Sequence, residues 1–144
     1  MLIGIDPVLT PDLLRHLSAM GHGDQLVIAD ANFPAETCGK RIERLAGVSA
    51  TEALRSILSI MPLDTYVKAP ARTMEVVGDP NAVPEIVAEF QDIINEVADN
   101  PCKIQGVERH AFYVEAEKTY CVVQTAEQRF YGNIILSKGV VPPK

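Results

Sequence analysis

The chain has 144 residues, of which 47% are hydrophobic and 22% are charged, a composition typical of one soluble globular domain. Its formal net charge of −6 argues against a general binder of nucleic acid or anionic membranes, because both attract basic surfaces. No apolar run approaches the ~18 residues of a membrane span, and the amino-terminal segment does not resemble a signal peptide. Three widely spaced cysteines indicate free thiols in a reducing compartment, so we expect a cytoplasmic protein.

Helices are predicted from capping residues and from apolar side chains at helical spacing. Thr10 can cap a first helix that starts at Pro11 and continues to residue 20. Ser49 and Glu52 fit a capping box, which starts a second helix that Pro62 closes. Residues 84–98 carry an apolar stripe along one side, which we interpret as core packing, and a further short helix is expected over residues 109–118.

Strands are predicted from short apolar runs bounded by turn residues, with residues 31–40 expected to form a loop. The expected strands are 25–29, 41–45, 72–77, 103–107, 120–125 and 133–137. Helices and strands alternate along the chain, which favours a layered α/β domain. The connection 127–132 is too short for a helical crossover, so part of the sheet is expected to be antiparallel. Without an internal repeat or linker, residues 1–144 are expected to form one domain.

The stretch from Gly21 to Pro34 contains the first candidate functional residues. His22 precedes the expected strand 25–29 and Asp30 follows it. A polar group at the end of a buried strand lies at a sheet edge, where open α/β folds place ligands. A histidine can exchange protons near neutral pH, and a carboxylate can hold a hydroxyl or orient that histidine. The alternative is purely structural, with a turn before the strand and Asp30 capping the next segment.

Two further polar clusters stand at element junctions. Arg109 follows the strand 103–107, where it can hold sugar hydroxyls or a carboxylate, or form a surface ion pair with Glu108. Tyr131, Gly132 and Asn133 combine a phenol, a permissive backbone and an amide just before an apolar strand, although the glycine can equally serve only the turn.

Familiar catalytic motifs are absent from the sequence. It contains no P-loop, no GxGxxG, no GxSxG and no HExxH, and the histidines and cysteines do not have metal-ligand spacing. The remaining inventory of His, Asp, Arg, Tyr and Asn suits a small polyhydroxylated ligand and proton transfer. It favours proton transfer over redox chemistry and phosphoryl transfer.

In this order, the polar clusters and the apolar segments beside them resemble the RbsD/FucU family of sugar mutarotases and pyranases. The resemblance extends from Gly4-Ile5-Asp6-Pro7 through Gly21-His22-Gly23-Asp24 and Ala29–Pro34 to Tyr131–Leu136 and Lys138-Gly139-Val140. Arg109 and Gly132 are typical of the fucose-type branch, whereas the ribose-type branch has His and usually Ala at these positions. His110 departs from the apolar residue that usually follows the Arg.

The resemblance implies a three-layer α/β/α domain with a mixed, mostly parallel sheet. It also implies interconversion of the α and β anomers of free L-fucose by ring opening and closure, with no cofactor or metal. His22 would be the acid/base and Tyr131 a second proton carrier. The substrate-binding residues would be Asp30, Arg109, Tyr131, Gly132 and Asn133. Family members form homo-oligomers, often decamers, so we expect an assembly of this kind.

Two other functions fit the same residues. A ribose pyranase shares the ring-opening step, and Arg109 in place of His is the available marker against it. A non-catalytic monosaccharide-binding protein could use the same pocket, but it would need no proton carrier at His22.

Overall fold

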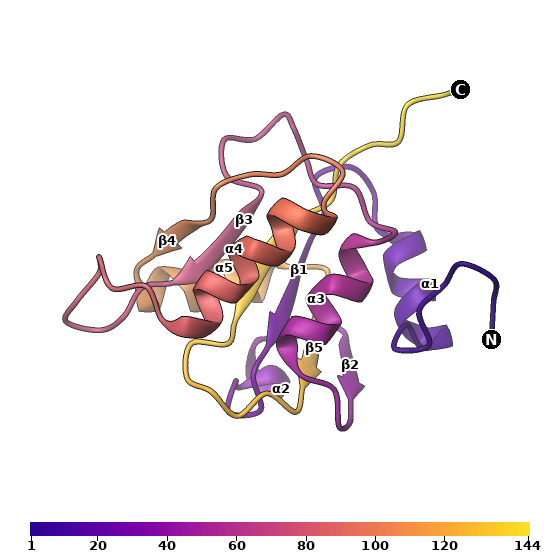
Figure 1. The fold of residues 1–144 in the computed structure, drawn as a ribbon. Helices are drawn as coiled ribbons and strands as arrows, with labels where there is room; N and C mark the ends of the chain where they lie inside the picture. The colour runs from indigo at the N-terminus through magenta and orange to yellow at the C-terminus, as the bar shows by residue number, and fades with distance from the viewer.

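Five helices and six strands follow one another along the 144 residues that this computed structural model describes (Figure 1). The helices are α1 (Pro11–Ala19), α2 (Ala35–Cys38), α3 (Ala50–Leu58), α4 (Glu85–Val97) and α5 (Arg109–Lys118). The strands are β1 (Gln25–Ala29), β2 (Ile42–Leu45), β3 (Ala71–Met74), β4 (Gln105–Val107), β5 (Cys121–Thr125) and β6 (Ile134–Ser137).

All six strands form one sheet in the order β2-β5-β1-β6-β3-β4. The pairs β1–β5, β2–β5 and β3–β4 are parallel, whereas β6 runs antiparallel to both of its neighbours, β1 and β3. The expectation of a mixed, mostly parallel sheet is therefore confirmed, and β6 is its antiparallel strand. The short connection into β6 explains this direction, because a parallel strand would need a longer crossover.

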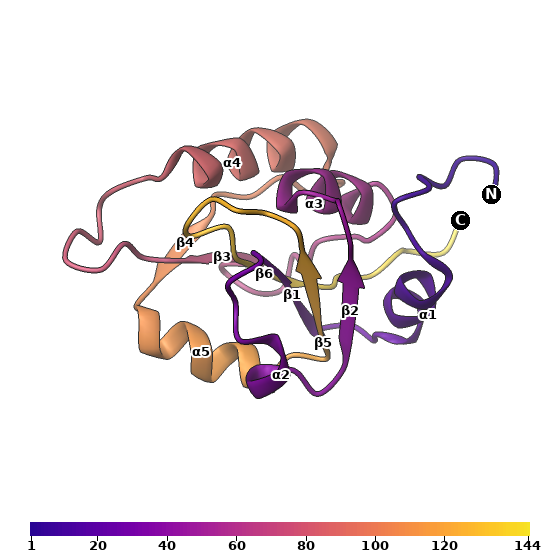
Figure 2. The same ribbon diagram turned by 90° about the horizontal axis from the view of Figure 1, so that it is seen from below.

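Helices cover both faces of the sheet, which gives the expected three layers (Figure 2). Helices α3 and α4 lie on one face and α2 and α5 on the other, while α1 lies at the β2 end of the sheet. Successive β1 side chains alternate between the two faces. Leu26 and Ile28 accordingly belong to the larger core cluster under α3 and α4, and Val27 and Ala29 belong to the smaller cluster under α5.

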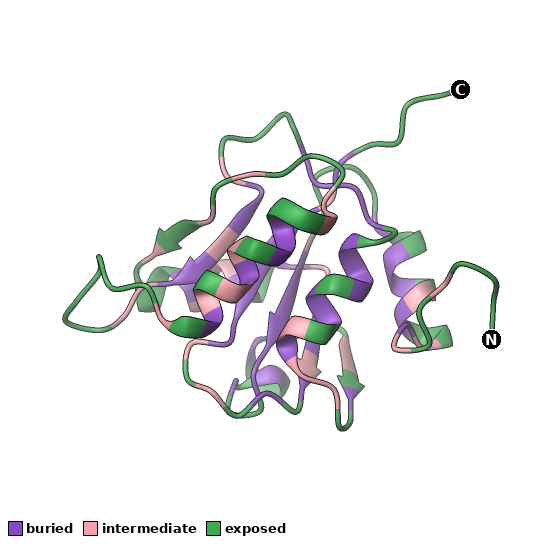
Figure 3. Ribbon diagram, in the orientation of Figure 1, coloured by how far each residue is buried: buried purple, intermediate pink, exposed green.

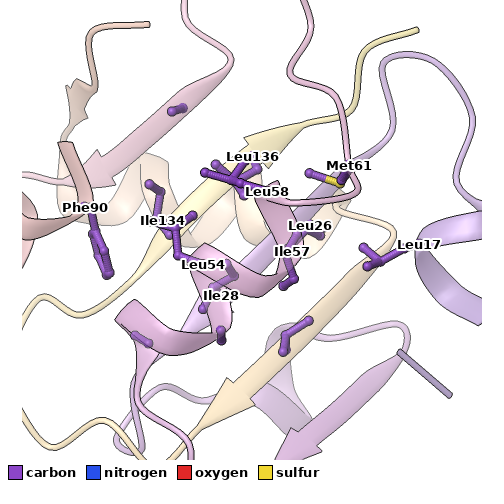
Figure 4. Close-up of a cluster of buried hydrophobic side chains, with 14 of the residues drawn as sticks. Leu17, Leu26, Ile28, Leu54, Ile57, Leu58, Met61, Phe90, Ile134 and Leu136 are labelled. Atoms are coloured by element: carbon purple, nitrogen blue, oxygen red, sulfur yellow. The ribbon is translucent and has the colours of Figure 1, made fainter. Parts of the chain in front are cut away.

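The larger core cluster is built from apolar side chains of α1, α3, α4 and the sheet (Figure 4). Leu54 and Ile57 on α3 and Phe90 on α4 are fully buried against Ile28 and Ile134 of the sheet. The stripe along α4 is thus core packing, as predicted. Burial is continuous along the central strands, whereas β4 and the connecting loops are largely exposed (Figure 3).

The helix starts follow the predicted capping residues. Thr10 accepts a hydrogen bond from the Leu13 N–H at 3.1 Å. In the capping box, the Glu52 N–H donates to Ser49 Oγ at 3.2 Å and the Ser49 N–H donates to Glu52 Oε2 at 2.8 Å. Such caps satisfy N–H groups that a helix leaves unpaired, and each stabilises the fold by about 1 kcal/mol.

The structure departs from the sequence predictions mainly at element ends. Residues 35–38, expected to lie in a loop, form the single helical turn α2, which buries Ala35 and Cys38 against the sheet. Strands β3 and β4 are shorter than predicted, because tertiary pairing covers only the overlapping residues 71–74 and 105–107. No helix is both long and apolar enough to cross a membrane.

Candidate active site

Residues from three parts of the chain meet at one end of the sheet, where the carboxyl ends of the parallel strands lie. Asp30 follows β1, Arg109 comes two residues after β4, and Asn133 immediately precedes β6. Since β6 runs opposite to the other strands, its beginning lies beside their carboxyl ends. A cavity of about 460 Å³ opens at this end. It is lined by Asp30, Asn32, Phe33, Met74, Val77, Arg109, Tyr113, Phe130, Tyr131 and Asn133.

A reciprocal pair of hydrogen bonds joins Asp30 to Asn133 beside the cavity. The Asp30 backbone N–H donates to Asn133 Oδ1 and Asn133 Nδ2 donates to Asp30 Oδ2, both at 2.9 Å. The Asn32 N–H donates to the other carboxylate oxygen at 3.0 Å. Asp30 is 4% exposed and Asn133 is 5% exposed, so the pair is a rigid polar feature within a largely apolar surrounding.

Two opposing effects set the protonation of Asp30. Burial raises the pKa of its carboxyl group, because the charged form loses hydration. The hydrogen bonds from Asn32 and Asn133 act in the opposite direction, and the net result is a pKa above the ordinary value. A buried carboxylate with free acceptor capacity beside a cavity is suited to hold a hydroxyl group of a ligand.

Tyr131 adopts a backbone conformation that non-glycine residues rarely occupy. Its φ is 64°, and it is the one non-glycine residue in the chain with a positive φ. Its phenolic oxygen accepts a hydrogen bond from the Val77 N–H at 3.2 Å, which links the segment before β6 to the segment after β3. Left-handed backbone at a cavity is a common form of stored strain at functional sites.

Gly132 does not line the cavity, but a side chain there would meet its surroundings at once. An added Cβ would lie 2.9 Å from Glu127 Cγ, 3.1 Å from Ile86 Cδ1 and 3.2 Å from the backbone oxygen of Arg129. Gly132 therefore lets two parts of the connection between β5 and β6 pack closely: the first part, with Glu127 and Arg129, and the last part, which leads into β6. Gly132 thus does more than permit a turn.

Arg109 is the first residue of α5, and its side chain is free to face the cavity. The carboxylate of Glu108 accepts hydrogen bonds from the His110 and Ala111 N–H groups at 2.9 and 3.0 Å, so it caps the helix instead of pairing with Arg109. The guanidinium carbon of Arg109 lies 5.8 Å from the centre of the Tyr113 ring. Arg109 therefore lines the cavity and does not form the ion pair with Glu108 that the sequence left open.

His22 lies at the other end of the sheet, so a single chain does not bring it to the cavity. It precedes β1, whereas Asp30 follows the same strand. Five strand residues span about 16 Å, a separation that no side chain bridges. The same end of the sheet holds the carboxyl end of β6, where the Gly23 N–H donates to the backbone oxygen of Lys138.

His22 has a partner that the sequence did not indicate. Its Nε2 lies 3.1 Å from Oδ1 of Asp64, and its ring is 5.1 Å from the Tyr66 ring. Burial opposes ionisation of Asp64, but hydrogen bonds from Tyr66 and His22 and the charge of His22 outweigh it and lower the pKa of the carboxyl group. Because an ionised Asp64 accepts, Nε2 of His22 carries the hydrogen and Nδ1 is left free.

Several lining residues also escaped the sequence interpretation. Met74, Val77 and Phe130 carry no chemistry that a pattern could single out, and in the sequence Tyr113 fits a site residue and a core residue equally well. The relevant signal for Tyr113 is its position four residues after Arg109 on a helix, which places both side chains on one face. Asp64 follows a helix-closing proline, a signal too general to identify a site. No three His, Cys, Asp or Glu side chains form a group that could ligate a metal ion.

Comparison with known proteins gives the family. A model described as the RbsD / FucU transport protein family matches residues 3–141. The chain belongs to this family. The resemblance inferred from its polar clusters is thereby confirmed.

Two relatives and one solved structure show how far the similarity extends. The chain is 40% identical over 144 residues to the L-fucose mutarotase of Histophilus somni strain 2336, covering 100% of both chains. It is 43% identical over 151 residues to the fucose mutarotase of Danio rerio, covering 100% of this chain and 97% of the relative. A crystal structure of the fucose mutarotase of Streptococcus pneumoniae in complex with L-fucose matches with a TM-score of 0.91 at 40% identity, covering 98% of this chain and 100% of that one.

Proposed function

We propose that this protein is an L-fucose mutarotase, an isomerase that interconverts the α and β anomers of free L-fucose. One observation carries the proposal: the buried Asp30–Asn133 pair lines a cavity with Arg109 and Tyr131, in a chain 40% identical over its full length to L-fucose mutarotases. Neutral sugars are bound through many directional hydrogen bonds to hydroxyl groups, which is the chemistry that carboxylate, amide and guanidinium groups provide.

The geometry of the cavity supports the substrate-binding roles that we propose. Asp30 and Arg109 would hold sugar hydroxyls by accepting and donating hydrogen bonds, respectively, and Asn133 can do either. Tyr131 would contact the sugar from the segment before β6. Gly132, assigned to the sugar site from the resemblance, lies behind Tyr131 and would contribute by allowing the close approach of that segment. Phe33 and Tyr113 provide aromatic surface beside the cavity, against which the apolar face of a deoxysugar can pack.

Ring opening needs two proton carriers. One group removes the proton of the anomeric hydroxyl as the bond between the anomeric carbon and the ring oxygen breaks, and the other protonates the ring oxygen. The open-chain aldehyde then rotates, and closure on its other face reverses both proton transfers. We assign the acid/base role to His22, whose Nδ1 is left free by Asp64, and the second role to Tyr131.

His22 lies at the opposite end of the sheet, so we propose that a second copy of the chain supplies it. Exposed apolar side chains support a contact between copies at both places. Tyr66, beside His22, is 77% exposed, and Phe130, at the cavity, is also 77% exposed. A homo-oligomer, in line with the expected decamer, would bury such surface. The unpaired cysteines are compatible with a cytoplasmic location.

The first test of the proposed activity is saturation-difference NMR on free L-fucose, with D-ribose measured in parallel. Saturating one anomeric proton and detecting transfer to the other reports exchange directly. Transfer above the uncatalysed rate with L-fucose alone supports the proposal. Transfer with D-ribose alone indicates a pyranase, and no transfer with either sugar indicates a binding protein.

A complementation experiment tests the shared site. His22→Ala is expected to be inactive alone and Asp30→Asn to keep at most about a tenth of the wild-type exchange, and the two are co-expressed in one cell. Each site then takes His22 from one copy and Asp30 from another, so about one quarter of the sites in a statistical mixture are intact. Recovered exchange supports a site between copies, whereas a mixture as inactive as its components contradicts it.

A further inference from the structure

Glu127 is a buried acidic residue on the segment between β5 and β6, the segment that forms one wall of the cavity. It is 5% exposed, although glutamate on a connecting segment ordinarily stays in water. It is not among the residues that line the cavity, so it does not face the ligand directly. Its burial therefore needs an explanation from its contacts.

The carboxylate of Glu127 is fully engaged by Arg129. The Arg129 backbone N–H and Nε both donate to Oε1 at 3.0 Å, and a terminal guanidinium nitrogen donates to Oε2 at 3.1 Å. The other terminal nitrogen donates to Oε1 of Glu89 on α4 at 2.8 Å. These hydrogen bonds lower the pKa of Glu127, so it stays ionised, and forked charge-assisted bonds hold the turn in one shape.

The rest of Glu127 contacts residues adjacent to the cavity lining in two segments, Ala31 after Asp30 and Gly132 between Tyr131 and Asn133. Its backbone oxygen accepts a hydrogen bond at 2.8 Å from the N–H of Ala31, the residue directly after Asp30. Its side-chain stem lies against Gly132, where an added Cβ would be 2.9 Å from Glu127 Cγ. Gly132 separates the left-handed Tyr131 from Asn133, so the stem supports the strained part of the wall.

We propose that Glu127 is the positioning residue of the sugar site, holding the Tyr131–Asn133 wall at a fixed distance from Asp30. This inference rests on the proposed function, because it assumes that the cavity binds the sugar. Its carboxylate fixes the turn through Arg129, its stem supports Gly132, and its backbone is tied to the segment of Asp30. Removing the carboxylate should loosen Tyr131 and Asn133 while leaving both side chains present.

The variant Glu127→Gln tests the proposal, with Glu89→Gln as the matched control. A misplaced contact of about 1 Å can cost on the order of 100-fold in rate, so we expect Glu127→Gln to lower kcat/KM for L-fucose exchange by about 10- to 100-fold. The loss should appear in kcat because Tyr131 is displaced, and in KM because Asn133 is displaced. Glu89 is half-exposed and only the outer partner of Arg129, so Glu89→Gln should stay within about twofold of the wild type.

A double-mutant cycle with Tyr131→Phe separates positioning from a general loss of stability. If Glu127 acts through Tyr131, the losses of the two single variants will not add in the double variant. Additive losses, or an unchanged KM in Glu127→Gln, overturn the proposal. Arg129→Lys weakens the same contact by changing the partner of Glu127, and it should raise KM as Glu127→Gln does. It provides a second test if Glu127→Gln does not fold.

A crystal structure of Glu127→Gln distinguishes this inference from the proposed function. Displacement of Tyr131 from its φ of 64° supports positioning by Glu127 even if the wild type does not exchange L-fucose anomers, a result that would refute only the activity. A variant in which Tyr131 and Asn133 keep their places overturns the inference, whatever the activity of the wild type.

Discussion

Replacing Asp30 by Asn removes one charge from the most buried polar feature of the cavity while keeping its size. The amide oxygen of Asn can still accept the hydrogen bond from the Asn32 N–H. The amide NH₂ then takes the place of Oδ2 and faces the side-chain NH₂ of Asn133, so two donors oppose each other. One hydrogen bond is lost in a buried position, which costs about 1–3 kcal/mol of stability.

Removing the charge of Asp30 has the opposite effect on stability, and this effect depends on pH. Burial holds the pKa of Asp30 above its ordinary value of 3.8, so the folded protein retains a proton that the unfolded chain has released. The stability of the wild type therefore falls as the pH rises from 3.8 through the raised pKa. Asn does not titrate there, so the stability gap between wild type and Asp30→Asn should narrow with rising pH.

For activity, the loss of the carboxylate is expected to dominate. A hydrogen bond from a sugar hydroxyl to an ionised acceptor is worth about 1.5–3 kcal/mol, and 1.4 kcal/mol corresponds to a factor of ten. Asp30→Asn should therefore lower kcat/KM for L-fucose exchange by about 10- to 100-fold. Because the fold persists, this loss should appear in a protein that still unfolds cooperatively.

Urea unfolding at a series of pH values from 3.8 upwards measures the stability gap, and saturation-difference NMR measures exchange. Asp6→Asn is the matched control, since hydrogen bonds from the Val8 N–H and the Ser56 hydroxyl lower the pKa of Asp6 from 3.8, and its stabilisation is lost only as the pH falls through that lower pKa. Its gap to the wild type should therefore not narrow with rising pH. A gap for Asp30→Asn that widens with pH, or unchanged exchange in that variant, would refute the reasoning.

Three further variants address other parts of the site. Asp64→Ala frees the His22 ring and should lower kcat by about tenfold with KM nearly unchanged; a drop confined to KM would argue against a role through the histidine. Arg109→His should weaken L-fucose exchange by about tenfold through the loss of a forked donor, measured beside D-ribose; full retention would mean that this position does not mark the fucose type. Tyr131→Phe should cost about 100-fold in kcat if the phenol carries a proton, and a loss below about threefold would assign it to binding alone.

The sequence predicted the order and type of most elements because local signals and burial agree in them. The capping box at Ser49 and the apolar stripe of α4 both point to structures that tertiary packing then stabilises. The turn α2 was missed because four residues are too few to produce a periodic pattern. Its helical conformation depends instead on burying Ala35 and Cys38 against the sheet.

The part of the candidate site that lies at the ends of strands was predictable from the sequence. Asp30, Arg109 and Asn133 lie together because parallel strands and one antiparallel strand bring their ends to one end of the sheet. Asp64 was not predictable, because its role depends on a contact with His22 across 42 positions of the chain. Glu127 was likewise hidden, since only the folded structure shows that a glutamate on a connecting turn is buried.

The separation of His22 from the cavity follows from strand geometry and not from any detail of side-chain placement. The residue before a strand and the residue after it must lie at opposite ends of that strand. Strand β1 is central in the sheet, with β5 and β6 paired along it. No rotamer of His22 and no local loop movement shortens that distance. If His22 and Asp30 act on one sugar, the two side chains must therefore come from different copies of the chain. Assembly is then a requirement of the chemistry, in addition to any contribution it makes to stability.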